Sequence, residues 1–533
     1  MTSEREGKGD GEGRRRGRKI PRRPNQNPRS PRTDVLARFK ARGLDPGTAL
    51  SVDGVSPRST LYVGPQLVAS AAHDNGDLLE RLSGIAGELG WELAIDDQFA
   101  SSRVTRTAPE KRQLGVSRFR LSVKPATAST VPDAWALLQR ARARFGLPAL
   151  QGVGLDHLLF PTPIMSNPHY DSNPRYDSNP HYDSNPIASY GRPGSGGRQP
   201  VAYAGPPPHR RSDEEMEGLR PVVGILDTGC GDHPWLTGVV QEGVTLDGKT
   251  IGQSAPATDP EVHGDLVGPL TGVIDELSGH GTFIAGLVHQ ACPDADILSW
   301  RIVNSEGPIV ESELIKALTQ IAELVQRAAD GEPGGRRIDV LNLSMGYYHE
   351  ADEDPDEVLF DPTMRDLLEL IGRCGTVVVC SAGNDATERP LYPAAFAPRR
   401  GGGRAAAEDR VPVVSVGALN PNRTVAMFSN TGGWVNTYER GASVLSTIPP
   451  FEGGLEPVAR WTADGKTRET IDPDDFTGGF ALWSGTSFAA PLVAGRIAAK
   501  MLDDMPSRHR QEKKSEAVER ARKAVAGLLE SSP

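Results

Sequence analysis

The second half of the chain contains four short runs of apolar residues, rich in Val, Ile and Leu and almost free of polar positions. Between successive runs, apolar residues recur every three or four positions, which is the spacing of a helix. Continuous apolarity is typical of strands that are covered on both faces, as in a parallel sheet flanked by helices. We therefore predict an α/β domain with a doubly wound, mostly parallel sheet over residues 220–505. Its strands are expected at Pro221–Leu226, Ile338–Leu343, Thr376–Cys380 and Val411–Val416.

Residues 34–160 show a different pattern and predict a separate, smaller domain. Short alternating runs, such as Phe119, Leu121 and Val123, indicate half-buried strands, and helical spacing recurs between them. The elements follow the order β-α-β-β-α-β, which is typical of a ferredoxin-like α+β sandwich. We expect strands near 60–70, 91–96, 117–125 and 155–160, and helices near 76–89 and 132–145.

Three segments lack the pattern of a packed core. Residues 1–33 are a basic, Pro-rich stretch that we interpret as a disordered tail, with contact to nucleic acid or acidic lipid as the alternative. Residues 161–219 carry a repeated unit, Ser-Asn-Pro-His/Arg-Tyr-Asp, and are predicted to be a flexible linker. Metal capture by His169 and His181 is the alternative reading of the repeats. Residues 506–533 are predicted to form a charged tail with a surface helix at Glu512–Leu529.

Composition narrows the possible functions. The 533 residues carry a formal net charge of −10, which argues against nucleic acid as the main ligand because phosphate binding needs a basic face. No apolar stretch follows the basic tail and no run is long enough for a membrane span, so we expect a cytoplasmic protein. Four cysteines without a CxxC pair fit a reducing compartment. His289 and Cys292 lack a second ligand pair, so no metal site is predicted there.

Polar residues of four different kinds stand where a parallel sheet places its catalytic groups, at strand ends and helix starts. Asp227 follows the strand in Gly-Ile-Leu-Asp-Thr-Gly. His280 opens a helix in Gly-His-Gly-Thr-Phe-Ile-Ala-Gly. Asn384 follows a strand in Cys-Ser-Ala-Gly-Asn. Ser487 begins a helix in Gly-Thr-Ser-Phe-Ala-Ala-Pro, whose Pro491 we expect to be tolerated as part of the first turn. Taken singly, such residues are most often helix caps or strand-end caps.

Taken together, the four segments resemble the signature blocks of the subtilisin-like serine peptidases, in that family's chain order of Asp, His, Asn and Ser. The similarity extends from Pro221 to the helix of Ser487. It implies a triad of Asp227, His280 and Ser487, with the amide of Asn384 in the oxyanion hole. It also implies that Leu343, Ser344, Met345 and Gly346 line the substrate cleft and pair with an extended peptide. Asp385 and the acidic loop around 472–475 depart from the usual family pattern.

The implied function is serine endopeptidase activity, in which a histidine base activates the serine and an acyl-enzyme forms. That chemistry requires no cofactor, and no clear set of calcium ligands is present, so structural calcium in the loops stays open. A pseudoprotease that only binds peptides, and a regulatory protease governed by its first domain, are the competing hypotheses. Residues 34–160 resemble family propeptides in element order, and a permanent regulatory domain is the alternative. The natural substrate and the oligomeric state are not predicted.

Overall fold

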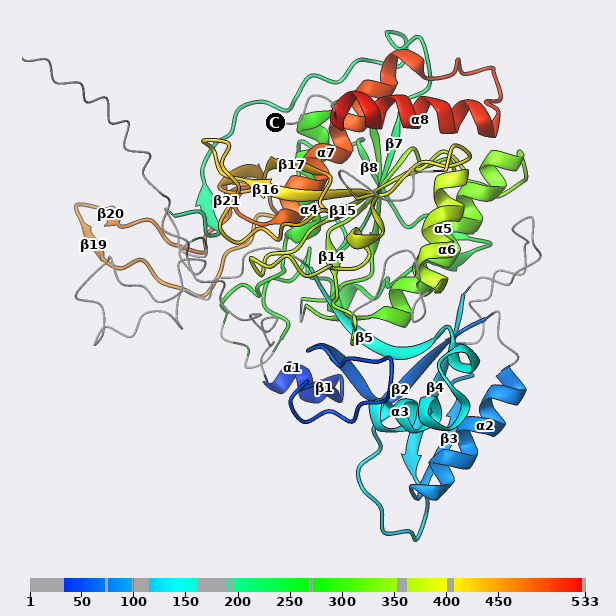
Figure 1. Cartoon of the computed structure of the whole chain (residues 1–533). Helices are drawn as coiled ribbons and strands as arrows, with labels where there is room; N and C mark the ends of the chain where they lie inside the picture. Colours follow the sequence, from blue (N-terminus) through cyan, green and yellow to red (C-terminus); the bar gives the residue numbers. More distant parts are fainter. Residues whose placement is uncertain are drawn as a thin grey trace, which may run out of the picture.

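Figure 1 shows the computed structural model of the chain, in which an α/β domain stands above a smaller α+β domain. The predicted basic tail up to residue 32 and the six-residue repeats lie outside the residues that the structure describes. These are residues 33–71, 75–97, 99, 115–161, 190, 195–267, 270, 272–305, 307–351, 362–399 and 407–529.

The larger domain is built on a seven-stranded parallel sheet, as predicted. The four apolar runs form its central strands, and three less regular strands, which the pattern did not reveal, complete its edges. In spatial order the strands are β17 (Thr437–Arg440), β16 (Val414–Leu419), β15 (Val377–Ser381), β13 (Val340–Leu343), β7 (Val222–Asp227), β11 (Asp296–Arg301) and β8 (Val240–Glu242).

Helices cover both faces of this sheet because successive residues of each strand point to opposite sides. In β7, Val223 and Ile225 pack into the cluster that contains α4 (His280–Ala291) and α7 (Thr486–Met501). Val222 and Leu226 pack into the cluster on the other face. That face is covered by α5 (Glu311–Asp330) and α6 (Pro362–Arg373). Strands with two buried faces explain the continuous apolar runs.

The smaller domain contains the six elements that the pattern of residues 34–160 predicted, in the predicted order. Its central strands run antiparallel in the order β5-β2-β4-β3, and two helices pack on one face of this sheet. A short helix and a short edge strand precede them. The bounds are α1 (Thr33–Arg38), β1 (Ala41–Gly43), β2 (Leu61–Ser70), α2 (Asn75–Glu88), β3 (Trp91–Ile95), β4 (Val116–Val123), α3 (Ala134–Phe145) and β5 (Val153–Pro161).

Strand β5 joins the two domains, as Figure 1 shows where it reaches from the lower domain toward β14. Its last residues pair antiparallel with two short strands of the larger domain, β12 (Ile309–Val310) and β14 (Met345–Gly346). The small sheet therefore continues across the domain boundary.

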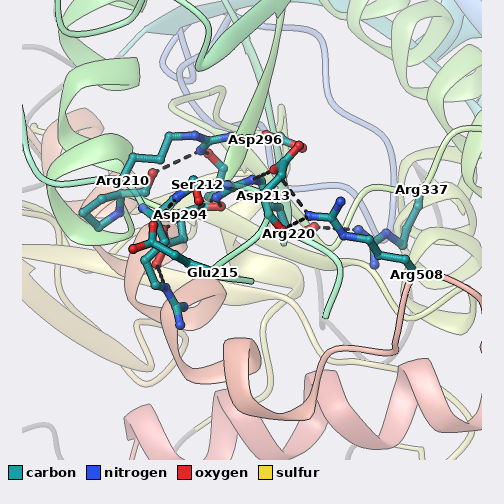
Figure 2. A network of polar contacts seen from close by, with 12 residues as sticks. Arg210, Ser212, Asp213, Glu215, Arg220, Asp294, Asp296, Arg337 and Arg508 are labelled. Carbon is teal, nitrogen blue, oxygen red and sulfur yellow. Dashed lines mark hydrogen bonds and ion pairs between the residues drawn. The ribbon is translucent and has the colours of Figure 1, made fainter. Parts of the chain in front are cut away.

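The structure adds contacts in two segments that were predicted to lie outside the larger domain. Within the predicted flexible linker, several of residues 195–219 contact the larger domain, although others are exposed. Strand β6 (Gln199–Val201) completes a three-stranded sheet with β21 (Phe480–Trp483) and β18 (Val444–Thr447). Farther along, Arg210 donates to the carbonyl of Pro293 and pairs with Asp296, in the polar network of Figure 2. Strand pairing, hydrogen bonds and ion pairs, which composition does not reveal, hold this segment.

The C-terminal helix is also more than a charged surface helix. Helix α8 (Lys514–Leu529) buries Val518, Ala521 and Val525 against the cluster of α7. The guanidinium of Arg520 in this helix donates hydrogen bonds to Asp339 and Glu512.

The remaining short strands are β9 (Thr245–Leu246), β10 (Lys249–Thr250), β19 (Arg460–Ala463) and β20 (Lys466–Glu469).

Candidate active site

Asp227 and His280 meet at the carboxyl end of β7. Asp227 is the last residue of the strand, and His280 is the first residue of α4, which begins after Gly279 in a left-handed conformation. His280 Nδ1 lies 2.6 Å from Asp227 Oδ1, and both side chains are completely buried. His280 Nε2 is buried too and makes no hydrogen bond to any described residue. A carboxylate therefore fixes one ring nitrogen and leaves the other available as a base.

The Asp227–His280 pair is supported by a second layer that the sequence analysis missed. The Thr228 amide donates to Asp227 Oδ1 at 2.8 Å, and the Thr228 hydroxyl accepts from the Gly281 amide at 2.7 Å. Glu261 accepts from the hydroxyls of Thr228 and Thr282. Burial raises the pKa of Glu261 to about 8, against the lowering effect of these hydrogen bonds. Thr228 lies within the motif of Asp227 and could have been noticed, whereas Glu261 stands in a loop without a motif.

Ser487 lies in the first turn of α7, and its backbone carbonyl is held in an unusual way. Pro491 is the sixth residue of the helix, not part of the first turn as we expected. It has no N–H to donate to the carbonyl four residues earlier, which is that of Ser487. The Ser344 hydroxyl donates to this carbonyl instead, at 3.0 Å, and Asn342 Nδ2 donates to the Ser344 oxygen at 2.9 Å.

The Ser487 hydroxyl and the His280 ring nitrogen Nε2 are both buried, and neither makes a hydrogen bond to a described residue. The rings of His280 and Phe488, the residue after Ser487, have centroids 5.2 Å apart. Serine–histidine contacts of this kind are often long in enzymes without substrate and tighten when one binds.

Asn384 follows β15 and lies beside the start of the same helix. Its Oδ1 accepts from the Thr486 amide at 3.0 Å and from the Thr486 hydroxyl at 2.9 Å. Both bonds go to the oxygen of the side chain, so the amide nitrogen is the end that can serve as a donor. Asn384 is thus held by Thr486, the residue before Ser487. An amide donor at this place is of the type that forms an oxyanion hole.

Two of the four predicted cleft residues, Met345 and Gly346, pair with the last part of β5. Leu343 ends β13, Ser344 follows it, and Met345 and Gly346 form β14. Strand β14 pairs with β5 in the register Met345↔Pro161 and Gly346↔Phe160. The strand that was predicted to pair with a peptide is thus paired with a segment of this chain.

A second buried cluster lies where β5 meets the larger domain. His157 Nδ1 lies 2.6 Å from Glu311 Oε2, and His157 Nε2 lies 2.9 Å from Glu350 Oε2. His157, His349 and Glu350 form the one group of metal-ligand type found among the described residues, with their ligand atoms within 4.8 Å of one another. Because each ring nitrogen of His157 faces a carboxylate oxygen, we interpret the cluster as an ionic bridge rather than a metal site.

The sequence of this chain was compared with known proteins. Residues 218–531, well over half of the chain, match the model of the subtilase family of serine-type peptidases. The chain belongs to the subtilase family. Subtilases are hydrolases, and the parallel sheet with flanking helices is this chain's form of the subtilisin-like α/β fold.

Two curated relatives of this subtilase are named intracellular proteases. An "Intracellular serine protease" of Paenibacillus polymyxa is 25% identical over 291 residues, which span 52% of this chain and 65% of the relative. The "Major intracellular serine protease" of Bacillus subtilis is 24% identical over 299 residues, which span 53% and 69%. The chain thus spans about two thirds of the length of these relatives.

Among solved structures, fervidolysin from Fervidobacterium pennivorans, described as a keratinolytic enzyme related to subtilisin, is 20% identical to this subtilase. It matches with a TM-score of 0.41 over 86% of this chain and 56% of that one. Among the described residues, no helix has both the length and the apolar character needed to cross a bilayer.

Proposed function

We propose that this subtilase is a serine endopeptidase that hydrolyses peptide bonds through an acyl-enzyme. Ser487 acts as the nucleophile, His280 takes its proton and returns it to the leaving amine, and Asp227 holds the imidazole in the productive tautomer. Asn384 and the Ser487 amide stabilise the oxyanion, aided by the dipole of α7. The observation that carries the proposal is the 2.6 Å contact between Asp227 and His280, whose Nε2 is buried without a hydrogen-bond partner among the described residues and whose ring contacts Phe488, the residue after Ser487.

A fluorophosphonate probe tests this assignment directly, because it reacts only with a serine activated by its neighbours. We expect one label per chain, on Ser487, and no label in Ser487→Ala. Turnover of a casein substrate should be lost in the same variant, whose thermal unfolding should match wild type because the change removes one oxygen atom. Retained turnover in Ser487→Ala would reject the triad. A mature wild-type protein, from which the smaller domain has been removed, that is folded but unlabelled would favour a peptide-binding module.

We also propose that substrates bind as extended strands along β14, by main-chain pairing. The pairing of Met345 and Gly346 with β5 supports this mode, because it demonstrates that an extended segment can lie there. Substrate must displace β5 from this strand before it can bind.

The smaller domain is then an inhibitor of the cleft, and we propose a ferredoxin-like, propeptide-like role for residues 34–160. The alternative is a permanent regulatory domain. Intact masses of wild type and Ser487→Ala, purified in parallel, separate the two. A wild type shortened within residues 162–194, beside a full-length Ser487→Ala, supports self-processing. Full-length masses for both, with an active wild type, support the permanent domain.

The names of the relatives support a cytoplasmic location.

A further inference from the structure

A short segment that lies before the family match contacts the approaches to both His280 and Ser487. The match begins at residue 218, and residues 196–201, which include β6, precede it. We call residues 196–201 the strap. Its first contact is with the loop that leads to His280, and its second is with the strand that leads to Ser487.

The contact with the histidine loop is made by Arg198. Its Nη1 donates to the carbonyls of Asp275 and Ser278, each at 3.1 Å, and its Nη2 donates to the carbonyls of Ile274 and Asp275 at 3.0 and 3.1 Å. Burial lowers the pKa of Arg198 to about 10, so the guanidinium still carries its charge at neutral pH. One planar side chain thus joins three carbonyls of the loop that ends two residues before His280. The rigid fork of donors makes arginine suited to such a position.

The contact with the serine strand is made by main-chain pairing. In β6, Gln199, Pro200 and Val201 pair antiparallel with Leu482, Ala481 and Phe480 of β21. Just beyond β21, the Ser484 hydroxyl donates to the Gly196 carbonyl at 2.6 Å and accepts from the Ser443 amide at 2.8 Å. Ser484 stands three residues before Ser487, so the strap fixes the chain directly before the candidate nucleophile.

Trp483 connects the two contacts. The guanidinium of Arg198 lies 4.9 Å from the centroid of a Trp483 ring, the geometry of a cation–π pair. The ring of His280 meets Trp483 edge to face, with centroids 5.7 Å apart. Trp483 is buried, so it has little room to turn if either neighbour changes.

We propose that Arg198 is a positioning residue for catalysis and that the strap sets the placement of His280 relative to Ser487. The inference rests on the proposed function, in which these two residues exchange a proton. A displacement of about 1 Å between reacting groups can lower the rate by roughly 10²-fold. The strap must therefore stay with the catalytic domain after any processing of the chain, and cleavage within residues 162–194 retains it.

The test compares Arg198→Ala and Arg198→Lys with a control from the same part of the chain, Arg210→Ala. Arg210 also donates to carbonyls, those of Pro293 and Ala295, but in the network of Figure 2, which contains none of the candidate catalytic residues. The proteins are full-length chains, and kcat and KM are measured separately on one fluorogenic peptide. Thermal unfolding shows how much stability each variant loses.

We expect kcat to fall about 100-fold in Arg198→Ala and about 10-fold in Arg198→Lys, which keeps the charge but not the fork of donors. KM should stay within about twofold because the substitution changes the placement of the catalytic groups rather than the binding of substrate. Arg210→Ala should lose stability while its kcat stays within about twofold of wild type.

The proposal is overturned if Arg198→Lys is folded and has wild-type kcat, or if Arg210→Ala loses as much kcat as Arg198→Ala. Arg198→Lys keeps the test valid if Arg198→Ala does not fold. Ser487→Ala, measured beside them, distinguishes a failure of the proposed triad from a failure of the proposed role of the strap. An active Ser487→Ala rejects the triad itself, whereas an inactive Ser487→Ala with an unaffected Arg198→Lys rejects only the strap.

Discussion

Two buried histidines in this molecule have the same kind of partner at Nδ1 but differ in the partner of Nε2. His280 and His157 each place Nδ1 2.6 Å from a carboxylate oxygen, of Asp227 and Glu311 respectively. The other nitrogen of His280 makes no hydrogen bond to a described residue, whereas that of His157 lies 2.9 Å from Glu350. A neutral imidazole has one donor nitrogen and carboxylates only accept, so His157 between two carboxylates is an imidazolium.

The comparison teaches that the second nitrogen decides what a histidine–carboxylate pair can do. One carboxylate orients a base and leaves it able to take a proton. Two carboxylates keep the proton in place. Burial alone lowers the pKa of His157, but the charges and hydrogen bonds of Glu311 and Glu350 outweigh it and raise the pKa to about 10. In the proposed function the first pair serves catalysis, whereas the second joins β5 to residues of the larger domain.

The largest effect is expected when the proposed base, His280, is removed. In His280→Ala we expect kcat to fall by on the order of 10⁶-fold, the size of loss that removal of the triad histidine causes in subtilisin, which belongs to the same family. Initial rates on a fluorogenic peptide measure it, with the fold checked by circular dichroism. His157→Ala should keep its kcat when this is measured at a saturating substrate concentration, which overcomes any inhibition by the smaller domain. Equal losses in the two variants would remove the distinction between the pairs.

A second prediction concerns the donor beside the first pair. Asn384→Ala should lower kcat by about 10²–10³-fold and leave KM nearly unchanged, because the amide meets the oxyanion mainly in the transition state. Steady-state kinetics with separate kcat and KM decide it. A raised KM with unchanged kcat would move Asn384 from the oxyanion hole to substrate binding.

A third prediction concerns the second pair and has a defined sign. The pKa of His157 is about 10 when β5 is docked and about 6.5 when β5 is released into water. A group with a raised pKa stabilises the docked state fully below pH 6.5 and loses that effect as pH rises toward 10. Docking of β5 should therefore weaken by up to about 1 kcal/mol per pH unit across this window.

Amide hydrogen exchange of residues 153–161 in full-length Ser487→Ala, corrected for intrinsic rates, measures this weakening. In Ser487→Ala with His157→Gln the slope with pH should disappear, and protection at pH 6.5 should fall. His263→Gln at an exposed position serves as the control. An unchanged slope in the His157 variant would assign the pH dependence to the other ionisable groups of this interface, which are Arg142, Glu311, Tyr347, His349 and Glu350.

The smallest expected effect concerns the carbonyl of Ser487. Ser344→Ala leaves this buried carbonyl without its donor, since Pro491 supplies no N–H, and should lower the free energy of unfolding by about 1–3 kcal/mol. Urea unfolding measures it. Ser415→Ala is the matched control, because its equally buried hydroxyl makes no hydrogen bond in the described part of the chain. Equal effects would mean that the loss comes from packing rather than from the hydrogen bond.

The sequence alone determined the parts of this subtilase whose signal is local. The parallel sheet was readable because strands such as β7 and β13 are covered on both faces and so carry continuous apolar runs. Asp227, His280, Asn384 and Ser487 were readable because each stands at a strand end or helix start within a short motif. The contact between Asp227 and His280, 53 positions apart, followed from their motifs and not from their spacing.

Only the tertiary structure decided which distant segments meet. Arg198 stood in a stretch whose composition predicted a flexible linker, and it is half-buried and held in place because carbonyls of a loop some 76–80 positions away accept its donors. Glu311 and Glu350 stood on no motif, and they matter because β5 brings His157 between them. Hydrogen bonds and ion pairs between distant segments leave no periodicity in a sequence, since each depends on a fold that the apolar pattern builds first.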